Sequence, residues 1–154
     1  MKKYLLTLFC LLILRLQAAP LEAAEPIGQR FGMSLIEVID SLHKEGVYEY
    51  SSNSGKPSDP ATFINVRFFD KTGQRMLSYG FLKDTCQMAT LVLPVAELDA
   101  LVQGYDGKFT NMGKQIWRTP YGLIKVSVAT GAESIRFDHK PHLLVRFDSF
   151  LGTN

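Results

Sequence analysis

The sequence is poor in cysteine, histidine and tryptophan. Its 154 residues include two cysteines, three histidines and one tryptophan. Cys10 lies in an apolar leader, so Cys86 is the one thiol of the remaining chain. A single thiol excludes an internal disulfide, and an exported domain of this kind must be held by its hydrophobic core. We expect Cys86 to be a small buried residue on a strand. The alternative is an intermolecular disulfide.

Motifs that carry common chemistry are also missing. There is no glycine-rich phosphate loop, and Ser78 lacks the flanking glycine of a nucleophile elbow. His139 and His142 are close in sequence, but zinc needs three or four donors and no further ligand is nearby. We therefore predict no catalytic residues, no metal and no cofactor, with these histidines in a solvated turn and His43 on a helix surface. A thiol enzyme centred on Cys86 is a further hypothesis, which would require an oriented histidine beside it.

No apolar run reaches the roughly twenty residues that a transmembrane helix needs. The longest run, Tyr4–Leu14, follows two lysines, which is the pattern of a secretory signal peptide. We expect residues 1–24 to be this signal, with cleavage after Ala18 as the first choice. An uncleaved anchor is the alternative, against which Arg15 counts because a charge within a membrane is costly. The absence of an N-glycosylation sequon favours a bacterial envelope, so the protein is expected to be periplasmic or secreted.

The charge of the chain is small. The formal net charge is +2 at pH 7, and three of the cations belong to the leader, so the remainder is close to neutral. A neutral domain lacks the basic signature of a nucleic-acid binder and the polybasic patch of a membrane-surface protein. The expected partner is another envelope protein, with no nucleic acid and no stable membrane anchor after signal cleavage. A small ligand is not excluded.

The strongest structural signal lies in residues 31–46, which we expect to form a helix. Ser34 followed by Glu37 makes a capping box, and Gly46 suits the left-handed stop at the other end. Four apolar residues fall on one helical face: Leu35, Val38, Ile39 and Leu42. This face must pack on another element, and most of the chain after Gly46 has the alternation of strands.

A period of two dominates the rest of the chain. It predicts strands over residues 47–52, 62–69, 75–83, 86–93, 114–119, 121–129 and 133–138, with a last strand through 143–147. A short helix is the alternative for that last segment. A second helix is predicted over 93–105, with Pro94 at its first position, and Ser51 to Pro60 is predicted to be a loop.

This order of elements predicts an α+β fold. We expect an antiparallel sheet with two helices on one face, and a loose duplication of an α-β-β-β unit. Residues 25–30 are expected to be an exposed lead-in to a single domain over 31–154.

Four aromatic residues stand at predicted strand edges or turns: Tyr48, Tyr50, Trp117 and Tyr121. Aromatic side chains with a polar tip are frequent at protein interfaces, so these four are candidate interaction residues. The alternative is that they pack across strands or over a helix edge.

Gly32-Met33-Ser34, followed by Glu37-Val38 and Leu42, resembles the opening helix of the small outer-membrane assembly lipoproteins of the SmpA/OmlA type. More broadly it resembles the fold that they share with the β-lactamase inhibitor proteins. The resemblance implies helices laid on an antiparallel sheet and a function in binding other proteins. The sequence departs from the lipoprotein pattern, because it has no acylated cysteine. The leading hypothesis is an exported, non-catalytic protein-binding module with an inhibitor, assembly or scaffold role. The second is a periplasmic protein that binds a small ligand between the sheet and the loop Ser51–Pro60.

Overall fold

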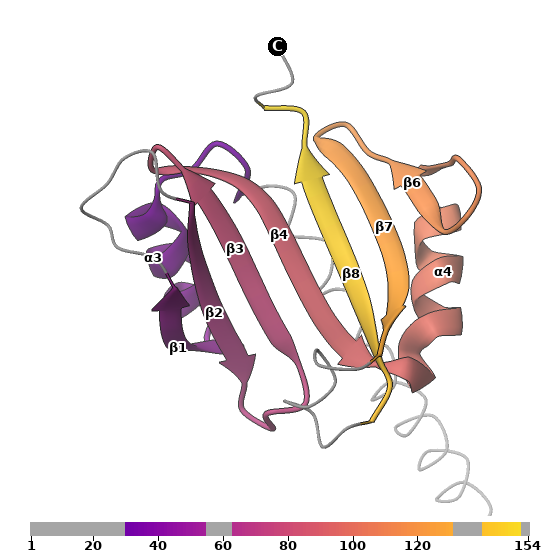
Figure 1. Ribbon diagram of the computed structural model, residues 1–154, viewed down its shortest axis with the longest axis horizontal. Coiled ribbons are helices and arrows are strands. Elements are labelled where there is room, and N and C mark those ends of the chain that lie inside the picture. Colours follow the sequence, from indigo (N-terminus) through magenta and orange to yellow (C-terminus); the bar gives the residue numbers. More distant parts are fainter. Residues whose placement is uncertain (1–29, 55–62, 131–139, 152–154) are drawn as a thin grey trace, which may run out of the picture.

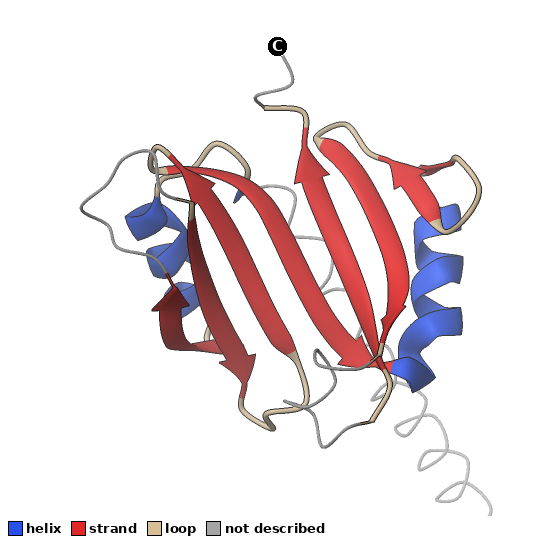
Figure 2. Ribbon diagram, in the orientation of Figure 1, coloured by secondary structure: helices blue, strands red, loops and turns tan. Residues whose placement is uncertain are grey.

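Within the residues that it describes, a computed structural model shows an eight-stranded antiparallel sheet accompanied by two α-helices, one at each end of the sheet (Figures 1 and 2). The structure describes residues 30–54, 63–130 and 140–151. The strand order is β1-β2-β3-β4-β8-β7-β6-β5, and every neighbouring pair is antiparallel. The prediction of an α+β fold is confirmed.

Among the described residues, each half of the chain contributes one α-helix and four strands. The first half contains α3 (Leu35–Glu45), β1 (Tyr48–Ser54), β2 (Ile64–Asp70), β3 (Met76–Leu82) and β4 (Thr85–Pro94). The second half contains the 3-10 turn η2 (Val95–Glu97), α4 (Leu98–Asp106), β5 (Thr110–Asn111), β6 (Ile116–Arg118), β7 (Gly122–Ala129) and β8 (His142–Ser149). The last strands of the two halves, β4 and β8, pair at the centre of the sheet. The described order of elements in each half is therefore α-β-β-β-β, whereas the expected duplicated unit was α-β-β-β. Neither helix in the described ranges has the length and hydropathy required to cross a membrane.

Helix α3 begins and ends at the predicted residues. The Ser34 hydroxyl accepts from the backbone N–H of Glu37, and the Glu37 carboxylate accepts from the backbone N–H of Ser34 at 2.8 Å. The backbone N–H of Ser34 and its hydroxyl, which also donates to the Glu37 carboxylate at 2.8 Å, lower the pKa of Glu37. Gly46 adopts φ 66° and its N–H donates to the Leu42 carbonyl, which closes the helix. Val38 and Leu42 are fully buried, as the apolar pattern predicts.

Both helices cover the same face of the sheet. Directly paired residues in an antiparallel sheet point to the same side, and one such row runs across the strands through Tyr79, Ala89, Phe147, Ile124 and Trp117. At one end of this row, the Trp117 ring lies 5.4 Å from the ring of Tyr105 on α4. At the other end, Tyr79 belongs to the same apolar cluster as the buried side chains of α3. We call this side the core face and the opposite side the open face.

Two boundaries of the second half differ from the prediction. Pro94 does not start a helix but ends β4, where it pairs with His142. The reason is that its pairing with His142 keeps Pro94 extended, with ψ 141°, so helical geometry begins only with η2. Strand β5 was not predicted because two residues carry no alternation. The strand predicted for the tail is confirmed as β8, and the strand predicted at 133–138 lies outside the described residues.

The expected lead-in ends in a buried residue. Arg30 is only 3% exposed. Its guanidinium donates to the Ser41 hydroxyl at 3.2 Å and to the Tyr79 hydroxyl at 3.1 Å, and it forms an ion pair with Glu45. Arg30 therefore ties α3 to β3 and belongs to the folded domain. The expectation of an exposed residue was wrong here, because a lone arginine in a polar segment gives no signal of tertiary partners.

Candidate binding site

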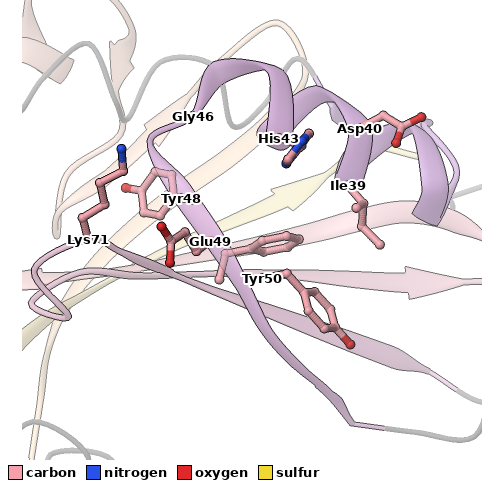
Figure 3. Close-up of a pocket in the computed structure, with 9 residues that line it drawn as sticks. Ile39, Asp40, His43, Gly46, Tyr48, Glu49, Tyr50 and Lys71 are labelled. Atoms are coloured by element: carbon pink, nitrogen blue, oxygen red, sulfur yellow. The ribbon is translucent and has the colours of Figure 1, made fainter.

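A pocket opens where α3 crosses the edge of the sheet (Figure 3). Its volume is about 370 Å³, within the range of roughly 300–1,000 Å³ usual for ligand pockets. Ile39, Asp40 and His43 come from α3, and Gly46 follows that helix. The other side consists of Tyr48, Glu49 and Tyr50 on β1, Phe68 on β2 and Lys71 in the following turn. Figure 3 shows Ile39 and His43 pointing from the helix toward β1. The pocket thus forms because β1 continues directly from α3 through a single glycine-closed turn.

The pocket has an aromatic floor that continues into the core. Tyr50 and Phe68 are paired on adjacent strands, and their rings meet edge to face with centroids 5.9 Å apart. The ring centroids of Phe68 and Tyr79 are 6.3 Å apart. The guanidinium carbon of Arg30 lies 5.9 Å from the centroid of the Tyr79 ring. Phe68 is buried, whereas Tyr50 remains 53% exposed. Tyr50 therefore forms the solvent-facing end of a rigid aromatic row.

The rim of the pocket carries both signs of charge. Asp40 and Glu49 contribute carboxylates, Lys71 contributes an ammonium group and His43 an imidazole (Figure 3). Tyr48 forms the inner wall, and its burial raises the pKa of its hydroxyl to about 12, so the phenol is neutral at physiological pH. A floor of rings with a mixed-charge rim is suited to holding an aromatic or aliphatic group that also carries polar atoms.

The four candidate interaction residues lie in two separate places. Tyr48 and Tyr50 meet at the pocket, but Tyr48 is buried and only Tyr50 presents its ring to solvent. Trp117 is 1% exposed and donates its Nε1–H to the Asp106 carboxylate at 2.7 Å, so it anchors α4 to β6. Tyr121 is exposed beyond the end of β6. The packing alternative therefore holds for Tyr48 and Trp117, and the exposed members are Tyr50 and Tyr121.

Tyr121 has apolar neighbours that the sequence did not single out. The backbone N–H of Phe150 donates to the Tyr121 carbonyl at 3.1 Å, which brings the two residues together after β8. The guanidinium of Arg118 lies 5.6 Å from the Phe150 ring. Phe150 and Leu151 are both exposed. This second cluster is found only through the pairing of β7 with β8, so sequence alone had no signal for it.

Cys86 lies in the core beneath α3. It is fully buried, and its backbone pairs with the segment before the helix, because its N–H donates to the Met33 carbonyl and its carbonyl accepts from Gly32. Burial raises the pKa of the Cys86 thiol to about 12. A thiol of this pKa is almost entirely protonated near neutral pH and is a poor nucleophile. The prediction of a small buried residue on a strand is confirmed.

One histidine, His142, lies in a different environment from the one expected. His142 does not lie in a solvated turn but begins β8 as a buried residue, with its Nδ1 2.8 Å from the Lys140 carbonyl oxygen. Strand pairing with Pro94 accounts for that burial. His43 is exposed on α3, as expected, and His139 lies outside the described residues. Among the residues described, no group of three or more histidine, cysteine or acidic side chains is placed to hold a metal ion.

Comparisons of the chain with protein-family models, with curated proteins and with solved structures find no match.

Proposed function

We propose that this chain is an exported, non-catalytic module that binds another protein of the cell envelope, in an inhibitor, assembly or scaffold role. The observation that carries the proposal is Tyr50, a half-exposed ring on the edge strand β1 that stands over an aromatic pocket. Buried aromatic anchors in pockets are where interface energy concentrates. The signal-peptide pattern of residues 1–24 supports export.

The chemistry of the described core supports a binding role. The Cys86 thiol is buried and protonated, and Ser78 bonds the Asn65 side-chain oxygen at 2.7 Å within the sheet. Both groups therefore have a structural role. The pocket offers rings and charged side chains, a composition that can recognise a partner through contacts alone.

Site-specific cross-linking tests the proposal. A photoreactive phenylalanine analogue replaces Tyr50 in the full chain, and the matched control carries it at Met112, which is exposed near the other end of the sheet. We expect one discrete protein adduct from position 50 in the cells that produce the protein, and none from position 112. Adducts absent from position 50, or identical from both positions, would argue against a partner at this pocket.

A second candidate function is the binding of a small molecule in the same pocket. The observation that favours it is the pocket volume of about 370 Å³, which exceeds the space that one partner side chain needs. Native mass spectrometry of the protein purified from its own cells distinguishes the two. A co-purified compound that is lost in Tyr50→Ala but kept in Met112→Ala would favour the small-ligand function.

Export has its own test. The intact mass of the exported form is expected to lack the first 18 to 24 residues. A full-length mass would favour the uncleaved anchor.

A further inference from the structure

The open face of the sheet carries a row of five residues, of which three are cations and two are neutral hydroxyl residues, although the chain as a whole is near neutral. Strand register aligns five directly paired positions across five strands: Arg67, Ser78, Thr90, Arg146 and Lys125. Each position alternates with buried core-face neighbours, so all five side chains leave the sheet on the side away from the helices. We call this set the basic row. Arg118 on β6 extends it by one strand, diagonal to Lys125.

The charges on this face are strongly unequal. From β2 through β6 the open-face positions hold four cations, and the one carboxylate among them is Asp148. Asp148 pairs with Arg146 at 2.8 Å, with both side chains about half exposed. The nearest additional carboxylate on this face is Glu49, on the edge strand. No ion pair within the described ranges engages Arg67 or Lys125.

The position of Lys125 opposite Arg146 is unfavourable for the fold itself. Like charges placed directly opposite each other on paired strands destabilise a sheet. Because β7 and β8 are interior strands, the ladder of hydrogen bonds keeps the two Cα positions opposite each other. An acidic partner would relieve this repulsion and give electrostatic complementarity across the interface.

The surroundings of the basic row favour a protein over a polyanion. One flanking row is apolar over four strands and ends at Ser127, with Val92 buried and the others partly exposed: Phe69, Met76, Val92 and Leu144. Arginine, methionine and aromatic residues together are the composition of protein interfaces. A nucleic-acid-binding domain would be strongly basic as a whole, which this chain is not.

We infer that the open face binds an acidic surface of a protein partner through the basic row. With strands about 4.8 Å apart, the cations from Arg67 to Arg118 span about 24 Å, which is ample for an interface patch. This inference rests on the proposed function. It specifies the surface of the partner, which would place carboxylates against Arg67, Lys125 and Arg146 and apolar groups over the flanking row.

Charge reversal tests the inference with a defined probe. A fluorescent peptide of glutamate and leucine is titrated against the full-length protein at low and at high salt. We expect saturable binding that weakens with salt, and a loss of affinity of roughly tenfold in Lys125→Glu and in Arg67→Glu. The matched control is Lys44→Glu, which makes the same charge change on the exposed side of α3 and is expected to bind like the parent. Thermal unfolding of each variant confirms that it is folded.

Two results would overturn the inference. One is equal affinity of Lys125→Glu and the parent for the peptide. The other is tighter binding to phosphatidylglycerol vesicles or to a short DNA duplex than to the peptide, which would assign the row to lipid or nucleic acid.

Cross-linking separates this inference from the proposed function. A photoreactive residue replaces Leu123 on the open face and, separately, Tyr50 at the pocket. A protein adduct from both positions, lost from Leu123 in the Arg67→Glu background, supports the inference. An adduct from Tyr50 alone refutes the basic row as an interface while the proposed function stands. No adduct from either position refutes both.

Discussion

Replacement of Arg30 by methionine is expected to destabilise the protein by about 3 kcal/mol. Methionine keeps the aliphatic bulk of arginine, so the main loss is polar. The Tyr79 hydroxyl, buried beneath α3, would lose its donor, and a buried polar group without a partner costs about 1–3 kcal/mol. Loss of the hydrogen bond from Arg30 to the Ser41 hydroxyl adds about 1 kcal/mol to this cost. The Glu45 side chain is 41% exposed and regains water, so its ion pair contributes about 1 kcal/mol at most.

A double-mutant cycle isolates the Arg30–Tyr79 contribution. Tyr79→Phe alone is expected to cost about 1–2 kcal/mol, because it leaves a guanidinium N–H unpaired. In the Arg30→Met background the same change removes an orphaned hydroxyl and is expected to be neutral or stabilising. The predicted coupling free energy is therefore about 2 kcal/mol.

Urea unfolding at pH 7, followed by circular dichroism, measures the cycle. Glu45→Gln is the control and is expected to change the free energy of unfolding by less than about 1 kcal/mol. If the costs of Arg30→Met and Tyr79→Phe add to within about 0.5 kcal/mol, the two side chains are not coupled and the reasoning is wrong.

Three further predictions concern the core. Tyr105→Phe is expected to raise the free energy of unfolding by about 1 kcal/mol, because the buried hydroxyl has no hydrogen-bond partner among the described residues; a lower melting temperature would contradict this. Cys86 is expected to resist iodoacetamide in the folded protein. The pKa of the Cys86 thiol is raised from 9.0 to about 12, so its contribution to stability is complete below pH 9 and is lost as the pH rises toward 12. Cys86→Ala should therefore reduce the loss of stability at alkaline pH. An identical pH profile of stability in the variant and the parent would refute this. Val38→Asp is expected to unfold the domain, since it places an unpaired carboxylate at a fully buried site. The control Val47→Asp, at a half-exposed site, should melt like the parent. Equal melting temperatures of the Val38→Asp and Val47→Asp variants would show that the helix face is wrongly placed.

Local chemistry was sufficient to predict most elements. Helix α3 is specified within its own residues, because the Ser34–Glu37 capping box and Gly46 act over a few positions. Strands such as β7 are specified by alternation, which needs no distant partner to be visible. Prediction failed where a contact distant in sequence decides the outcome. Pro94 satisfied a rule for helix starts, but its pairing with His142 kept it in a strand.

The candidate site shows the same division. Tyr50 was predicted as an interaction residue and is exposed at the pocket, whereas Trp117 had an identical sequence rationale and is buried beneath α4. An aromatic residue at a strand edge is compatible both with exposure at an interface and with burial in the core. Only the placement of the neighbouring helix decides between the two. His43 was predicted on the surface of the helix and Lys71 in a turn, but their common place around one pocket depends on the packing of α3 beside β1 and β2.

By itself the sequence determined which segments are helices and strands and which side of each is apolar, because capping and periodicity are properties of neighbouring residues. The tertiary structure alone decided that Arg30 is buried and that Arg67, Arg146 and Lys125 stand in one line. The physical reason is that an alternating strand specifies its two faces but not its partner. The pairing of β4 with β8 joins segments about fifty residues apart, and only that long-range register converts scattered cations of a near-neutral chain into a basic face.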